Sequence, residues 1–179
     1  MAKTEDYYAI NYAASLIDEC GLGDFSSTQL TKKLAGKIVR VSPNIGWYSE
    51  GFYGSSSATD FETMLQLINL YFTRPRKDDD AFKAYKEKEI AETVNSKNRP
   101  ETTFYDSMTV NLYRKHFWIK PTDEELVKKM DLEKSFTFFK DRISDASDFT
   151  FFFVGSFKTD VIKPMVEKYI AILLQERRN

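Results

Sequence analysis

The chain has 179 residues and a formal net charge of −1, with 42% apolar and 30% charged residues. A chain of this length builds one domain and buries roughly 70% of its unfolded surface, so we expect a single domain over residues 1–179. The near-neutral charge gives no overall field that would steer the chain toward nucleic acids or anionic lipids. The longest apolar stretch, Tyr169–Leu174, is too short to cross a bilayer. We therefore predict a soluble protein with no nucleic-acid partner and no membrane insertion, in either the periplasm or the cytoplasm.

Two helices are predicted at the start of the chain. Apolar residues at helical spacing indicate a helix over 6–20, which Gly21 ends. Ser26 and Gln29 then form the capping-box pattern of a short second helix.

A β-hairpin is expected next. Residues 37–42 are rich in β-branched side chains and residues 47–53 are rich in aromatic ones. The Pro-Asn-Ile-Gly sequence over 43–46 is typical of a turn.

Further helices are predicted after the hairpin. Each begins with a residue that suits a helix N-terminus and continues with apolar residues at helical spacing. The predicted starts are Ser57, Asp78, Pro100, Thr122 and Asp131, and a last helix is expected over 161–174.

A strand is predicted over Phe149–Val154, between the last two long helices. Its residues are apolar on both faces, as in a strand at the centre of a sheet. The element order indicates an α+β fold, with a mainly antiparallel sheet packed by several helices. Only three strands are visible, so a buried central strand indicates a truncated domain that lacks strands before the first helix.

The sequence offers few ligands for a catalytic metal. A zinc enzyme commonly uses three protein ligands, mostly histidines and cysteines. This chain has one histidine, His116, and one cysteine, Cys20, on different predicted elements. We therefore predict no metal site and no catalytic residues in this chain.

His116 is the one candidate for a general base, since a serine or cysteine nucleophile needs a neighbouring base that is usually histidine. The simpler interpretation is a loop histidine close to a helix C-terminus, where a partial positive charge is favourable. Cys20 lies on the predicted inner side of the first helix, where a thiol packs as a small apolar group.

Aromatic residues gather in the predicted hairpin. Such side chains stack on nucleic-acid bases when cations are interleaved, but few cations lie here and the net charge does not favour it. A core position or a protein-facing surface is the alternative. We take Trp47, Tyr48 and Phe52 as candidates for contact with a peptide or with another domain.

Several blocks in order resemble the insulinase/pitrilysin-type (inverzincin) zinc metallopeptidases, especially bacterial members with two fused halves. The resemblance covers 12–174, and the shared order of the blocks is more specific than any one block. The blocks are Ala13–Ile17, Gly21–Gly23, Leu34–Lys37, Gly54–Ser57, Thr73–Arg76, His116 with Pro121–Leu126, Asp131–Leu132, Phe138–Phe139, Asp145–Phe157 and Ile162–Ile170.

The resemblance implies a degenerate, non-catalytic domain. Active domains of this family carry H-x-x-E-H on an early helix and a further Glu on a later one. The matching helix here, through Ala13–Ile17, has no histidine, and Glu87, Glu89 and Glu92 on the later helix do not rebuild the site. The parent protein would be a zinc metalloendopeptidase with zinc in its catalytic half.

The same resemblance implies the partners of this domain. It would form chamber wall, contact the substrate peptide and pack against the catalytic half of the same polypeptide. Two alternatives stay open: a stand-alone binding or assembly module with the same fold, and an enzyme of another class that uses His116. An open sheet edge also predicts self-association.

Overall fold

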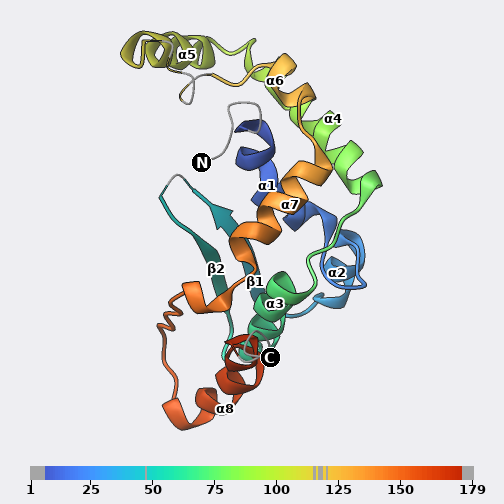
Figure 1. The fold of residues 1–179 in the computed structure, drawn as a ribbon, viewed down its shortest axis with the longest axis vertical. Helices are drawn as coiled ribbons and strands as arrows, with labels where there is room; N and C mark the ends of the chain where they lie inside the picture. The colour runs from blue at the N-terminus through green and yellow to red at the C-terminus, as the bar shows by residue number, and fades with distance from the viewer. Residues whose placement is uncertain (1–6, 47, 115, 117–118, 120, 175–179) are drawn as a thin grey trace.

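The computed structural model describes residues 7–46, 48–114, 116, 119 and 121–174. In these residues, helices pack against one two-stranded antiparallel sheet that lies along one side of the molecule, which confirms the predicted α+β class (Figure 1). The elements are α1 (Tyr7–Cys20), α2 (Ser27–Lys33), β1 (Val39–Ile45), β2 (Glu50–Ser56), α3 (Phe61–Thr73), α4 (Asp79–Ser96), α5 (Pro100–Leu112), α6 (Glu124–Lys128), α7 (Leu132–Ile143), the 3-10 turn η2 (Ala146–Asp148), α8 (Thr159–Tyr169) and the 3-10 turn η3 (Ala171–Leu174).

Short-range signals place the starts of α2, α4 and α7 correctly. The predictions for two other helices are displaced: α3 begins at Phe61 and not at Ser57, and α6 is capped by Asp123 and not by Thr122. The capping box of α2 is formed, with Ser26 Oγ accepting from the Gln29 N–H and Gln29 Oε1 accepting from the Ser26 N–H. Asp78 and Asp131 cap α4 and α7 by accepting backbone N–H groups in the first turn. These bonds satisfy donors that a helix leaves without intrahelical partners.

The hairpin turn lies later than predicted. Strands β1 and β2 pair from Val39 opposite Ser56 to Ile45 opposite Glu50, and the Gly46 N–H closes the turn on the Ser49 carbonyl at 2.8 Å. The 43–46 turn prediction is therefore wrong. Proline is tolerated on an edge strand, and both strands of a two-stranded sheet are edges.

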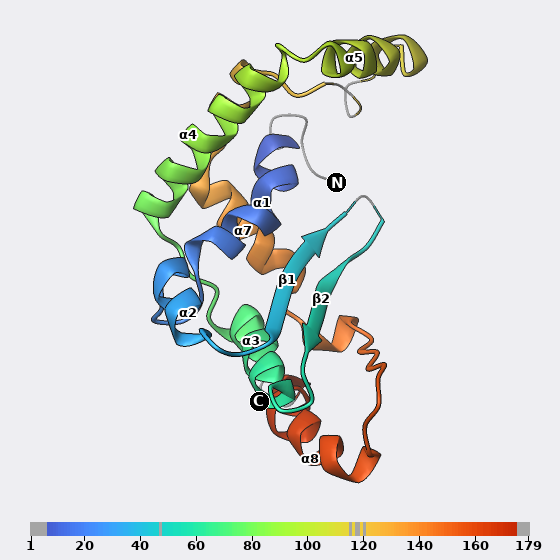
Figure 2. The same ribbon diagram turned by 180° about the vertical axis from the view of Figure 1, so that it is seen from behind.

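Helices α1, α3 and α7 pack against the hairpin and one another around the main cluster, the larger of two groups of buried side chains (Figure 1 and Figure 2). Phenylalanines of the 149–153 segment and side chains of α8 pack around its rim. Its buried members are Ala13, Ile17, Leu22, Val41, Met64, Leu65, Leu67, Ile68, Tyr71, Phe139, Ile143 and Ile170.

The predicted strand over 149–154 is an extended segment with no strand paired to it in the described part of the chain. Phe149, Phe151 and Phe153 are half-buried, whereas Phe152 and Val154 are exposed. The prediction of a central strand, buried on both faces, is therefore wrong for this chain. Apolar composition does not supply a neighbouring strand, and pairing requires one.

Helix α4 packs on α1 and α6, and α5 extends beyond the end of α4 as an arm at the far end of the molecule in both views (Figure 1 and Figure 2). Tyr85 is the buried residue of α4, and no residue of α5 is buried. No helix in the described ranges is both long enough and apolar enough to span a membrane.

Candidate functional site between α1 and α4

Helix α1 contacts α4 through a second group of buried side chains, the interhelix cluster. The α1 members, Leu16 and Cys20, have no exposed surface. Helix α6 contacts α4, and Val127 of α6 and Met130 of the turn after it also belong to the cluster. Its buried members are Leu16, Cys20, Tyr85, Val127, Met130 and Leu132.

Aromatic rings fill the space where α1 faces the middle of α4. The Tyr12 and Tyr85 rings meet edge to face with centroids 6.4 Å apart. Burial, and next the nearby Glu89 carboxylate, raise the pKa of the Tyr85 hydroxyl, which also makes a hydrogen bond with Ser15. This phenol stays protonated at neutral pH and acts as a packing group with one polar end.

Among the carboxylates of α4, Glu89 has the largest effect on the pKa of Tyr85. Burial raises the pKa of Glu89, and the neighbouring Glu92 carboxylate raises it further. Glu87 and Glu92 are exposed. Among the residues with described positions, no group of three or more His, Cys, Asp and Glu side chains is arranged to hold a metal ion.

The only thiol points inward. Cys20 Sγ lies 3.8 Å from the Asp78 carbonyl oxygen, and burial raises the pKa of the thiol. The thiolate is the reactive form of cysteine, so this position favours an inert packing group, as the sequence indicated.

His116 follows α5 at the far end of the arm. Its backbone N–H donates to the Tyr113 carbonyl at 2.8 Å, and its carbonyl accepts from the Ile119 N–H at 3.1 Å. The side chain is exposed. This is the loop position beyond a helix C-terminus that the simpler interpretation predicted, and it belongs to a different part of the molecule from Cys20.

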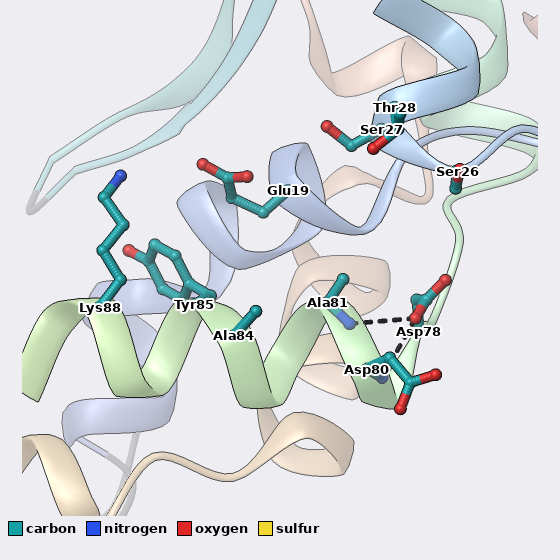
Figure 3. A pocket seen from close by; sticks show the side chains of 10 residues that line it. All are labelled: Glu19, Ser26, Ser27, Thr28, Asp78, Asp80, Ala81, Ala84, Tyr85 and Lys88. Atoms are coloured by element: carbon teal, nitrogen blue, oxygen red, sulfur yellow. Dashed lines mark hydrogen bonds between the residues drawn. The ribbon is translucent and has the colours of Figure 1, made fainter.

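A surface pocket of about 440 Å³ opens beside the interhelix cluster, between the end of α1 and the starts of α2 and α4 (Figure 3). Its polar lining includes Glu19, Asp78, Asp80 and Lys88, so acidic groups outnumber basic ones. The Asp78 carboxylate accepts the N–H groups of Asp80 and Ala81, each at 3.1 Å, as the dashed lines show.

The Asp78 carboxylate is not suited to acid–base catalysis near neutral pH, because its hydrogen bonds lower its pKa. The Ala81 N–H, and next the Arg76 guanidinium, hold the pKa of its carboxyl below the ordinary value. A general acid or base works best with a pKa near the operating pH. The pocket walls therefore present fixed charge and hydroxyl groups, and none of its lining residues is a histidine or a cysteine.

The three contact candidates of the hairpin have different positions. Trp47 lies outside the described residues. Tyr48 is fully exposed next to the turn. Phe52 packs inward, with its ring centroid 5.2 Å from that of Phe72 and 5.3 Å from that of Tyr71. The contact role of these residues stays a prediction.

Sequence reasoning did not single out Tyr12, Ser15 and Tyr85, which meet where α1 faces α4. Helical spacing placed Tyr85 on an apolar face but did not say which helix that face contacts. The resemblance alone, which paired an early helix with a later one, gave a signal for this contact.

Comparisons with known proteins find proteases that resemble this chain. The chain is 23% identical over 167 residues to the probable zinc protease PqqL of Haemophilus influenzae, which covers 93% of this chain and 18% of that protein. No protein-family model matches the chain.

Two solved structures share the fold. The periplasmic protease PqqL from Escherichia coli superposes with a TM-score of 0.73 and 20% identity over 94% of this chain and 19% of that one. The ferredoxin protease FusC, a mutant solved in complex with Arabidopsis ferredoxin, gives 0.71 and 16% identity over 93% of this chain and 18% of that one.

This chain thus spans about a fifth of the length of the proteins that it matches. The sequence similarity and the shared fold support the resemblance read from the sequence to insulinase/pitrilysin-type zinc metallopeptidases: the chain has the fold of one segment of the proteases PqqL and FusC.

Proposed function

We propose that this chain is a non-catalytic domain of a zinc metalloendopeptidase, and that zinc is held by the catalytic half of the same polypeptide. The observation that carries this proposal is the composition of α1. In active family members the early helix carries H-x-x-E-H. In this chain the matching part of α1 supplies Ala13, Leu16 and Ile17, each with no exposed surface.

The surroundings of α1 support the same conclusion. A zinc ion needs ligands with free lone pairs that point to one centre. The α1–α4 contact instead holds the Tyr12 and Tyr85 rings and the Leu16 side chain, with Glu89 at its edge. The side chains at this contact serve to pack the two helices together, as expected for a domain with a structural role.

Two exposed surfaces are suited to the remaining roles. Tyr48 at the hairpin turn presents its whole ring to solvent, where an aromatic side chain can contact a substrate peptide. On α5, Phe104 is 65% exposed and Leu112 is 67% exposed. Large exposed apolar patches mark protein–protein contacts, so we assign α5 to the interface with another domain.

The experiment uses the purified chain. After incubation with zinc and dialysis, we expect no stoichiometric zinc by elemental analysis and no cleavage of fluorescein-labelled casein. Fluorescence polarisation with labelled casein peptides should detect weak binding. Tyr48→Ala should raise the Kd of that binding roughly fivefold, which is the loss of about 1 kcal/mol expected for an exposed aromatic contact.

Ile38→Ala is the matched control, because Ile38 is 73% exposed at the opposite end of the hairpin. Stoichiometric zinc together with chelator-sensitive cleavage would refute the proposal. Cleavage without zinc that His116→Ala abolishes would support the enzyme of another class. If Tyr48→Ala and Ile38→Ala raise the peptide Kd equally, Tyr48 does not contact the peptide.

The stand-alone assembly module is the second candidate. It is favoured by the main cluster, in which residues from α1, β1, α3 and α7 bury one another within this chain. The full open reading frame separates the two candidates. An H-x-x-E-H half in the same polypeptide supports the peptidase domain, and its absence supports the module.

A further inference from the structure

The segment Phe149–Val154 has the side-chain pattern of a one-sided strand. Phe149, Phe151 and Phe153 pack against the rim of the main cluster, with ring centroids 5.2 Å apart for Phe72 and Phe149 and 5.7 Å apart for Phe61 and Phe153. The intervening Phe152 is 84% exposed and Val154 is 98% exposed. Alternation with a period of two is the pattern of a strand with one buried face.

Its backbone is available for pairing. The Phe149 N–H donates to the Ala146 carbonyl at 3.2 Å, and within the described part of the chain no backbone–backbone hydrogen bond involves residues 150–157. Figures 1 and 2 show the segment between η2 and α8 running outside β2, on the side away from β1. A row of open donors and acceptors on an extended segment is a template for another strand.

The composition of the segment favours association. It contains no charged residue, no proline and no glycine, and five of its six residues are phenylalanine or valine. Short segments of this kind pair readily when they are exposed. The charges that flank it differ in sign, with Asp145 and Asp148 before it and Lys158 after it.

We propose that two copies of this chain form a symmetric dimer by antiparallel pairing of Phe149–Val154. Two identical strands present matching numbers of backbone N–H donors and carbonyl acceptors, so each copy can satisfy the backbone hydrogen bonds of the other. Antiparallel pairing brings the acidic end of one strand beside the basic end of its partner, whereas parallel pairing would place like charges together. A two-fold axis closes the assembly at two copies.

The side-chain alternation fixes a register. If Phe151 lies opposite Phe151 of the second copy, all three half-buried phenylalanines of each copy lie on the same face of the new sheet. Both copies then keep their main clusters on that face, and Phe152 of one copy lies across from Thr150 of the other. The inference concerns the chain by itself and holds whether or not its parent is a peptidase.

Sedimentation velocity over a range of protein concentrations tests the dimer. We expect a monomer–dimer equilibrium for the unmodified chain. Phe152→Lys should raise the dimer Kd roughly tenfold or more, because the added charge occurs twice in a symmetric dimer. Val154→Pro should do the same by removing a strand N–H. Both side chains are exposed, so thermal unfolding should be unchanged.

Leu112→Lys is the control, because Leu112 is a comparably exposed apolar residue on a helix. Hydrogen exchange at low and high protein concentration locates the interface. The amides of 150–154 should be better protected at the high concentration. A chain that stays monomeric at every concentration overturns the proposal. So does a dimer that Leu112→Lys disrupts and Phe152→Lys does not, or one whose protection appears outside this segment.

Discussion

At the residue scale, Asp60 shows how one carboxylate joins elements that are distant in sequence. It precedes α3, and its Oδ2 accepts from the Ile38 N–H at 2.9 Å and from Ser57 Oγ at 2.6 Å. These bonds connect the start of β1 to the start of α3. The Ser57 hydroxyl, and next the Ile38 N–H, hold the pKa of the Asp60 carboxyl below its ordinary value of 3.8.

We predict that Asp60→Asn lowers the free energy of unfolding at neutral pH. A depressed pKa in the folded state means that the ionised carboxylate stabilises the fold above pH 3.8, and that this stabilisation disappears as the pH falls through the lower folded pKa. Urea unfolding between pH 7 and pH 3 should therefore show the two proteins converging in acid.

Asp24→Asn is the control, because Asp24 pairs with Arg74 at 2.6 Å on the surface and its side chain is 75% exposed. Such pairs contribute little to stability, so its effect should be small. A difference between Asp60→Asn and the unmodified chain that persists unchanged at pH 3 would contradict the argument.

The residue scale also shows the limit of composition. The sequence predicted a contact role equally for the aromatic residues of the hairpin, yet Tyr48 faces solvent and Phe52 packs on Phe72. Strand alternation would place positions 48 and 52 on the same face, but Tyr48 lies in the turn before β2 begins at Glu50. The inward position of Phe52 depends on α3, which comes later in the chain.

At the element scale, two glycines end the first two helices in different surroundings. Gly21 follows α1 with φ +86°, and Gly36 lies beyond α2 with φ +82°. A Cβ at Gly21 would overlap the Phe25 carbonyl oxygen and lie 2.6 Å from the Ser27 nitrogen. A Cβ at Gly36 would have no neighbour within 4 Å.

We predict that Gly21→Ala destabilises the chain clearly more than Gly36→Ala. Both alanines take on left-handed strain of about 1–2 kcal/mol, and Gly21→Ala also requires the backbone at Phe25 to move. Denaturant midpoints measure the difference. Equal midpoints for the two variants would show that the backbone after α1 relaxes without cost.

The starts of α2, α4 and α7 were the parts of the fold that the sequence predicted best, whereas α8 ends at Tyr169 and not at the predicted residue 174. The caps of α2, α4 and α7 act within three residues, so their signals are complete in a short window. The 43–46 turn failed because strand pairing extended β1 through Pro43 to Ile45.

At the scale of the whole molecule, the chain divides into a packed body and an exposed arm. The main cluster holds α1, α3 and α7 together. Helix α5 buries no residue, and apolar side chains such as Phe104 and Leu112 remain exposed. Local stability follows buried contacts, so the two parts should open with different free energies.

We predict that amides of α5 exchange with solvent much faster than those of α3. Leu112→Glu should change the free energy of unfolding by no more than about 0.5 kcal/mol, because the residue lies outside the core. Native-state hydrogen exchange and urea unfolding test both statements. Protection of α5 equal to that of α3 in dilute solution would show that the arm is held by contacts with the body.

The sequence by itself determined the helix caps, the family resemblance and the supply of one imidazole and one thiol for any metal chemistry. Caps and ligand counts depend on near neighbours or on composition alone. The tertiary structure decided that α1 meets α4, that Phe52 points inward and that the Phe149–Val154 segment has an open backbone. Burial and strand pairing depend on partners distant in the chain, and no local pattern names those partners.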